Sequence, residues 1–92
     1  MKGWRIEMIE FEHTVKDPVG LHARPAGRLV KEAARYKSRI VLAANGKSVE
    51  ATRLMALMGM CVKTGTVLRV TVEGEDESTC APAFQAFLAG NL

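Results

Sequence analysis

Four stretches of the chain have the patterns of β-strands. Apolar and polar residues alternate in the first and the last, the second is a short apolar run, and the third is its return strand after a turn. In the first stretch Ile9 and Phe11 share one side, whereas Glu10 and Glu12 share the other. The dipeptide Asn45-Gly46, between the second and third stretches, is a strong signal for a tight hairpin turn. The pattern therefore predicts four strands, at residues 5–15, 39–44, 47–51 and 66–73.

Three further stretches have apolar residues at the three- to four-residue spacing of an amphipathic helix. The first helix is expected from Ala23 to about Tyr36, and the second, a short one, from Thr52 to Gly59. In the first helix we expect small and aliphatic residues to form the buried stripe, with Leu29 beside it, namely Ala26, Val30, Ala33 and Ala34. The third helix is C-terminal.

The third helix contains a proline, and the residue at which the helix begins determines whether this proline costs a backbone hydrogen bond. A helix that began at Glu77 would place Pro82 in the interior, where the missing N–H removes a hydrogen bond. We therefore expect Ser78 or Thr79 to cap the helix, because Pro82 then stays near the first turn. Phe84, Phe87 and Leu88 are expected to pack on the sheet.

The element order is β-α-β-β-α-β-α, without an internal repeat or a linker. Ninety-two residues are enough for one modest core, so residues 1–92 are expected to form a single domain. By the rules of layer packing, four antiparallel strands covered by three helices on one face leave the other face in solvent. The predicted fold class is α+β.

Composition excludes several classes of protein. A hydrophobic content of 48% with 25% charged residues is typical of a globular chain and not of a disordered one. No apolar run is long enough to span a bilayer, and Glu7 and Glu10 interrupt the N-terminal stretch, so we expect neither membrane insertion nor a signal peptide. Cys61 and Cys80 form no CxxC motif, and we interpret both as reduced core or near-core thiols of a cytoplasmic protein.

Charge is distributed unevenly along the chain. Residues 1–53 hold 11 basic and 6 acidic side chains, a net charge of +5, whereas residues 54–92 hold 2 and 4, a net charge of −2. This asymmetry favours an acidic protein partner over nucleic acid, because aromatic residues that would stack on bases are scarce. His13 has no second histidine or carboxylate at metal-ligand spacing, so we interpret it as a core or sheet-edge histidine and expect no metal site.

The second histidine, His22, stands directly before a predicted helix start, in the string V-G-L-H-A-R-P-A of residues 19–26. Pro25 falls in the first turn, and the backbone N–H groups of Ala23 and Arg24 are expected to face an anion at this helix end. The guanidinium of Arg24 adds a group that binds phosphate oxygens two at a time. The pattern indicates a histidine that carries a phosphoryl group; the alternative is a histidine that only caps the helix.

The string G-L-H-A-R-P-A resembles the active-site signature of the histidine phosphocarrier proteins (HPr) of the bacterial sugar phosphotransferase system. The resemblance extends over about residues 5–92 and implies an open-faced β-sandwich. Four further strings look like HPr at matching spacing: N-G-K at 45–47, L-M-A-L-M at 54–58, T-G-T at 64–66 and E-G-E-D-E at 73–77.

The resemblance implies a phosphoryl relay. Enzyme I, charged by phosphoenolpyruvate, would transfer a phosphoryl group to Nδ1 of His22, which would pass it to an enzyme IIA-type domain in sugar uptake or a related regulatory branch. Arg24 would stabilise the group, and no metal or organic cofactor would be needed. The chain would be a cytoplasmic, monomeric carrier with a phosphohistidine intermediate and not a stand-alone catalyst.

Two groups of side chains are candidates for contact with these partners. On the face of the first helix opposite the buried stripe, basic residues recur and are expected to steer an acidic partner, namely Arg24, Arg28, Lys31 and Arg35. The second helix has more apolar side chains than one core-facing stripe requires. Its Leu54, Met55 and Met58 either form an exposed contact patch or belong to the core.

One position departs from the resemblance. In HPr proteins that are substrates of an HPr kinase, a regulatory serine starts the second helix, and a gap-free match puts Arg53 there. Arginine cannot accept the phosphoryl group, so we expect the kinase-controlled switch to be absent; Ser48 and Thr52 are close by but not in the matching position.

Two rival functions remain. A regulatory binding module that keeps the HPr surface but transfers nothing is expected to lack the histidine, and His22 is present. A small hydrolase that uses His22 as a base would need a nucleophile, and no serine or cysteine stands in the motif.

Overall fold

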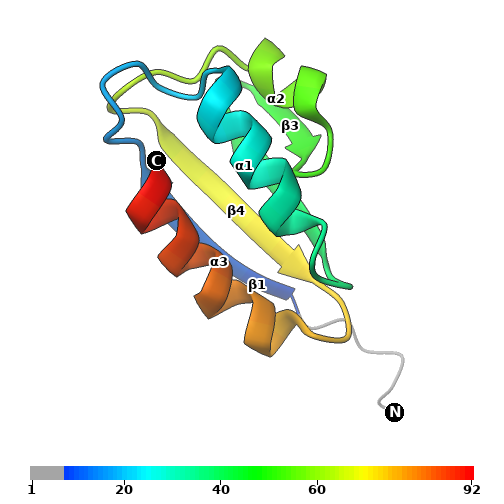
Figure 1. Ribbon diagram of the computed structural model, residues 1–92. Helices are drawn as coiled ribbons and strands as arrows, with labels where there is room; N and C mark the ends of the chain where they lie inside the picture. The colour runs from blue at the N-terminus through cyan, green and yellow to red at the C-terminus, as the bar shows by residue number, and fades with distance from the viewer. Residues whose placement is uncertain (1–7) are drawn as a thin grey trace.

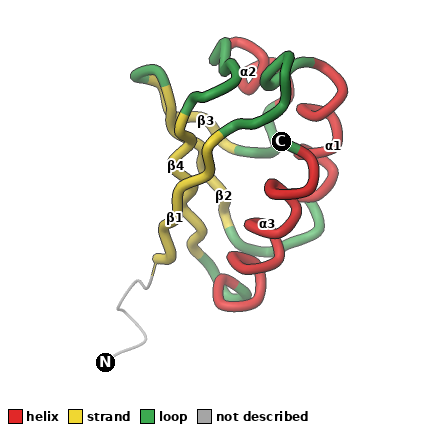
Figure 2. Tube along the Cα trace, turned by 90° about the vertical axis from the view of Figure 1, so that its left-hand side faces the viewer, coloured by secondary structure: helices red, strands yellow, loops and turns green. Residues whose placement is uncertain are grey.

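The structure, a computed structural model, describes residues 8–92 as a four-stranded antiparallel sheet with three helices. The strands are β1 (Met8–Thr14), β2 (Arg39–Ala44), β3 (Lys47–Glu50) and β4 (Val67–Glu73), and the helices are α1 (Ala23–Ala33), α2 (Leu54–Gly59) and α3 (Glu77–Asn91). The strand order across the sheet is β1-β4-β2-β3. Figures 1 and 2 show the helices on one side of the sheet only. The predicted α+β open-faced sandwich is confirmed.

Element boundaries differ from the prediction by a few residues. The expected strand start at 5–7 lies outside the described residues. The first helix ends at Ala33 and not near Tyr36, because the N–H groups of Arg35 and Tyr36 bond three residues back and tighten the chain into a turn. The second helix begins at Leu54, since Arg53 has an extended backbone.

The core lies between the sheet and the helices. Because β4 is a central strand and its residues alternate, its even-numbered side chains are fully buried, namely Leu68, Val70 and Val72. Leu29 of α1 and Phe84 and Leu88 of α3 are also fully buried in this core. Burial of one large aliphatic or aromatic side chain stabilises the fold by about 1.5–3 kcal/mol. One part of the predicted stripe was wrong: Ala34 is exposed, because α1 has ended before it.

The start of α3 also differs from the prediction. Asp76 precedes the helix, and its backbone carbonyl accepts the N–H groups of Thr79 and Cys80 at 3.0 and 2.7 Å. The Asp76 carboxylate binds the hydroxyl and N–H of Ser38 and the N–H of Lys37, which together lower the pKa of Asp76. This anchor starts the helix at Glu77, so neither Ser78 nor Thr79 caps it. Pro82 consequently lies inside α3, on its exposed side.

The loop between β1 and α1 is held by backbone hydrogen bonds from two neighbouring segments. Leu21 donates to Val62 at 2.9 Å, and Gly65 donates to Val15 at 2.8 Å. On its other side the loop donates two N–H groups, those of Lys16 and Asp17, to the carbonyl of Leu92, the residue after α3. These bonds hold the loop that leads into α1.

Gly20 is the tightest point of this loop. Its φ of +83° lies in the left-handed region, and an added Cβ would collide with the carbonyl oxygen of Val62 and lie 2.8 Å from the Cα of Lys63. Any other residue would be strained in its backbone conformation and would also push the two segments apart.

The interior proline of α3 leads to a stability prediction. We expect Pro82→Ala to raise the free energy of unfolding by about 1–2 kcal/mol, because an alanine N–H can bond to the Ser78 carbonyl. Without the proline the unfolded chain has more conformational freedom, and this lowers the gain by roughly 0.4–1 kcal/mol. Urea unfolding followed by circular dichroism measures the change. The exposed Gln85→Ala is the matched control, expected to stay within about 0.5 kcal/mol. A less stable proline variant would contradict the analysis.

The close approach at Gly20 leads to a second prediction. Gly20→Ala is expected to lower the free energy of unfolding by at least about 1–2 kcal/mol, the usual penalty for a left-handed side-chain-bearing residue. Gly27 in α1 has open space where a Cβ would stand, so Gly27→Ala is expected to raise stability by roughly 0.5–1 kcal/mol. The same urea titration compares the two variants, and effects of equal sign would show that the Val62 contact is unimportant.

Candidate functional site

His22 is the N-cap residue of α1. Its backbone is extended, with φ −102° and ψ −173°, and its carbonyl accepts the N–H of Ala26 at 2.9 Å. The imidazole makes no capping hydrogen bond, and 38% of the side chain is exposed. The first-turn N–H groups have no acceptor within the helix, so the end of α1 remains available to an anion beside the ring.

One carboxylate faces the imidazole. Oδ1 of Asp17 lies 3.8 Å from Nε2 of His22, within ion-pair range but longer than a hydrogen bond. The same Oδ1 accepts the N–H of Val19 at 2.8 Å, which orients the carboxylate within the loop. Asp17 is not among the site residues expected from the sequence. Nothing in the local sequence indicates the contact, because it depends on how the loop folds back before α1.

Two guanidinium groups complete the site. An open hollow of about 430 Å³ holds His22 together with Arg24 and Arg28. Its lining residues are Asp17, Val19, His22, Arg24, Pro25, Arg28 and Asn91. Both arginines are exposed, and they come from the first two turns of α1. The arrangement offers positive charge and backbone donors to a small dianion that remains accessible from solvent.

The other two basic residues of the predicted stripe lie farther along the chain. Lys31 is exposed in the last turn of α1, and Arg35 lies beyond the end of the helix. The Arg35 guanidinium bonds to the carboxylate of Glu32 at 3.1 Å. The structure therefore places Arg24 and Arg28 in the same hollow as His22. Lys31 and Arg35 are not among the residues that line this hollow.

The apolar side chains of α2 separate into two groups. Leu57 is fully buried, whereas Met55 is 78% exposed, Leu54 40% and Met58 37%. Of the two readings of Leu54, Met55 and Met58, the exposed patch is therefore the one found in the structure. Figure 1 shows α2 beside α1, at the end of the molecule where α1 begins. We call these three residues the α2 patch.

The two cysteines and the other histidine lie outside the site. Cys80 is buried as expected, and burial raises the pKa of its thiol to about 11. Cys61 is exposed, which corrects the expectation of a core thiol: the chain turns outward after α2, with Cys61 at a φ of +55°. Burial lowers the pKa of His13, and its buried Nε2 has no hydrogen-bond partner among residues 8–92.

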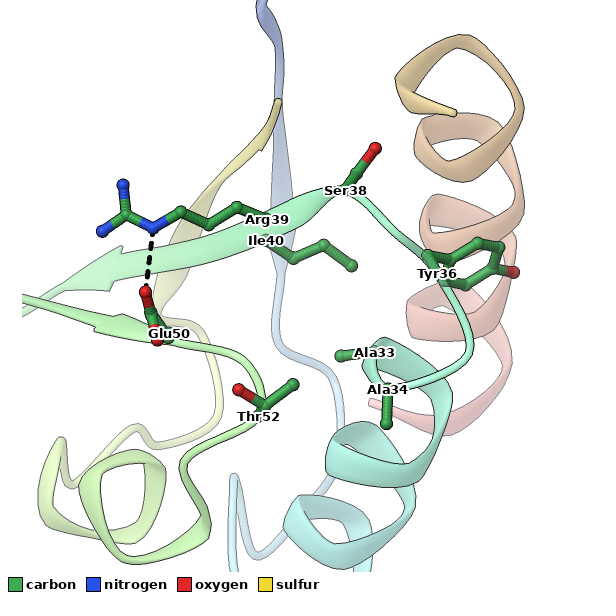
Figure 3. A pocket seen from close by; sticks show the side chains of 8 residues that line it. All are labelled: Ala33, Ala34, Tyr36, Ser38, Arg39, Ile40, Glu50 and Thr52. Atoms are coloured by element: carbon green, nitrogen blue, oxygen red, sulfur yellow. Dashed lines mark hydrogen bonds and ion pairs between the residues drawn. The ribbon is translucent and has the colours of Figure 1, made fainter. Parts of the chain in front are cut away.

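A second hollow, of about 410 Å³, lies at the opposite end of α1 (Figure 3). Ala33 and Ala34 line it on one side, and Arg39 and Glu50 form an ion pair at 2.9 Å on the other. An 11-residue helix at about 1.5 Å per residue separates its two ends by about 15 Å. The hollow contains no histidine or cysteine, so it is separate from the candidate site.

Other kinds of site are not found in residues 8–92. No group of three or more side chains suited to metal binding occurs there. Over the same residues, every helix is too short or too polar to cross a bilayer.

The chain is similar to known proteins along most of its length. Residues 9–90 match the family model described as "PTS HPr component phosphorylation site". The chain is 40% identical over 76 residues to the phosphocarrier protein HPr of Xylella fastidiosa (strain Temecula1), an alignment that covers 83% of this chain and 85% of the relative. It is 37% identical over 81 residues to the HPr-like protein Crh of Bacillus subtilis (strain 168), covering 88% and 95%.

Solved structures of HPr and of the HPr-like protein Crh are also similar to this chain. The histidine-containing phosphocarrier protein of Mycoplasma superposes with a TM-score of 0.84 at 35% identity, over 89% of this chain and 93% of that one. A crystal structure of Bacillus subtilis Crh, described as a swapped dimer, gives a TM-score of 0.71 at 36% identity, over 87% and 92%. Together with the histidine at the start of α1, these similarities show that the chain belongs to the HPr family of phosphocarriers of the phosphotransferase system.

Proposed function

We propose that this protein accepts a phosphoryl group on Nδ1 of His22 from phosphorylated enzyme I and passes it to an enzyme IIA-type domain. Phosphoenolpyruvate charges enzyme I, and the transfer takes place in the cytoplasm. The observation that carries the proposal is the partly exposed imidazole at the start of α1, in one open hollow with the guanidinium groups of Arg24 and Arg28.

The geometry favours Nδ1 as the acceptor. Nε2 faces the carboxylate of Asp17 at 3.8 Å, where a phosphoryl group would meet a negative charge. Nδ1 is one bond closer to the backbone than Nε2 is, so it is the ring nitrogen better able to approach the N–H groups of the first turn, as the side-chain oxygen of an ordinary N-cap does. A phosphoryl group on Nδ1 therefore gains the donors at the helix end and avoids the carboxylate.

The stabilisation at this site is modest. A helix N-terminus contributes about 0.3–1 kcal/mol to a negative group at an exposed site. A charge-assisted hydrogen bond from Arg24 adds about 1.5–3 kcal/mol. A carrier must release its cargo, and this site stabilises the phosphoryl group without enclosing it. The partners supply the remaining alignment for each transfer, and neither a metal nor an organic cofactor is required.

Both partners use the face around His22, because each must reach the same nitrogen atom. Arg28 and Lys31 steer acidic surfaces towards the site, and the α2 patch of Leu54, Met55 and Met58 supplies apolar contact. Flexible thioethers adapt to more than one surface, which suits successive binding of two different partners. The carrier acts as a monomer, since a permanent partner on this face would block transfer.

The alternative function is a regulatory binding module that transfers nothing. Similarity to Bacillus subtilis Crh, which is described as a catabolite repression HPr, is the observation that favours it. The two functions share the fold and the surface, and they differ only in whether His22 becomes phosphorylated.

Labelling with radioactive phosphoenolpyruvate and enzyme I decides between them. We expect acid-labile label on the wild-type chain and none on His22→Ala, because His22 is the one histidine among the residues that line the hollow. His13→Gln is the matched control: it removes the other histidine, which lies outside the hollow, and is expected to keep the label. An unlabelled wild-type chain, with enzyme I active on another HPr, would favour the binding module.

Control by an HPr kinase is expected to be absent. Arg53 occupies the N-cap of α2 and offers no hydroxyl group. Incubation with an HPr kinase and ATP should leave the wild-type chain unmodified, whereas Arg53→Ser should acquire an acid-stable, alkali-labile phosphate. Such a phosphate on the wild-type chain, for example on Ser48 or Thr52, would contradict this prediction.

A further inference from the structure

We infer that Asp17 is a positioning residue for the phosphoryl acceptor: its carboxylate holds the proton of His22 on Nε2 and leaves the Nδ1 lone pair free to react. The inference deepens the proposed function and rests on it. It assigns a second task to the loop before α1, in addition to delivering the histidine.

The carboxylate is held in place by its own backbone. Asp17 donates its N–H to the carbonyl of Leu92 at 3.0 Å, and its own carbonyl accepts the N–H of Gly20 at 3.0 Å and the hydroxyl of Thr64. The Val19 N–H then binds Oδ1, which faces the imidazole. Backbone and side chain of Asp17 are thus both tethered, which holds Oδ1 on the side of the ring that carries Nε2.

Asp17 is the only carboxylate within ion-pair range of His22 among residues 8–92. The charged groups that line the same hollow from α1, Arg24 and Arg28, are positive, and α3 contributes the uncharged Asn91. The two kinds of charge at the site therefore have separate roles. The negative Asp17 faces Nε2, and the positive arginines are available to the phosphoryl group. A 3.8 Å separation shortens readily when partner binding orders the ring, since catalytic contacts are often long in the free protein.

The chemistry of transfer requires this proton position. A neutral imidazole attacks through the nitrogen that lacks a proton, so attack by Nδ1 needs the proton on Nε2. As the P–Nδ1 bond forms, the bond between phosphorus and the donor enzyme breaks and its electron pair stays with the donor. The ring becomes a cation that retains Nε2–H, and the adjacent carboxylate stabilises that cation.

The onward transfer uses the same arrangement. When the P–Nδ1 bond breaks, its electron pair returns to Nδ1 and a neutral imidazole leaves, still protonated on Nε2. No proton has to move in either direction. Loss of the Nε2 proton would instead make the leaving group an imidazolate anion, a much poorer one.

The test compares two variants with a charge-matched control. Asp17→Asn keeps an acceptor for Val19 but removes the charge, and Asp17→Ser keeps the short turn through its hydroxyl group. Glu75→Gln removes an exposed carboxylate from the turn before α3, where it pairs with Lys37 at 3.9 Å. Nitrogen-15 spectra report the tautomer of the neutral His22 ring, and rapid-quench labelling reports the rate of phosphoryl transfer from enzyme I.

We expect the ring of the wild-type chain and of Glu75→Gln to be predominantly Nε2–H. In the Asp17 variants the share of Nδ1–H should rise, and the transfer rate should fall about 10-fold or more, the usual size of such an effect for groups that orient a histidine. The amide spectra identify any variant that fails to fold, in which case the other variant decides. An unchanged tautomer in a folded Asp17 variant would overturn the inference.

The two hypotheses fail in different ways. A wild-type chain that takes no label from an active enzyme I would remove the proposed function, and Asp17 would then have no transfer to assist. A labelled wild-type chain with Asp17 variants of equal rate and tautomer would leave the carrier function intact and remove only the role of Asp17.

Discussion

The backbone hydrogen bonds that hold residues 15–21 are the constraint on which the rest of the site depends. Leu21 is bonded to Val62, and two N–H groups of the loop share the carbonyl of Leu92, so the loop is joined both to the segment before β4 and to the end of α3. Gly20 allows the contact with Val62 because it has no side chain. The local sequence sets the start of α1 at Ala23, and these long-range contacts hold the loop before it and so fix the environment of His22.

Much of the fold was predictable because it follows from local patterns. Alternation identified the first and last strands, and an apolar run beside the Asn45-Gly46 signal identified the middle two. Asn45 and Gly46 do form the hairpin turn, both at positive φ. What local pattern could not supply was contact between distant segments. Asp76 starts α3 because its carboxylate binds Ser38, 38 residues away in the chain, and this anchor outweighs the conflict at Pro82.

The same distinction applies to the site. His22, Arg24 and Arg28 were predictable, because a histidine before a helix start and arginines four residues apart on one face meet at the same end of that helix. The spatial relation of Asp17 to Nε2 was not, since it depends on a loop that doubles back over four residues. The exposure of the α2 patch required the structure as well: Leu57 and Met60 fill the available core, and the remaining apolar side chains are left outside.

The contrast between the two thiols has a practical consequence. Cys61 is exposed shortly after α2. Cys80 is buried, and burial raises the pKa of its thiol to about 11, so it stays protonated at neutral pH. A maleimide dye will therefore attach at a single, known point close to the α2 patch without any engineered cysteine. The unmodified sequence thus provides its own fluorescent reporter for the arrival and departure of each partner, in real time and at the surface where docking is proposed.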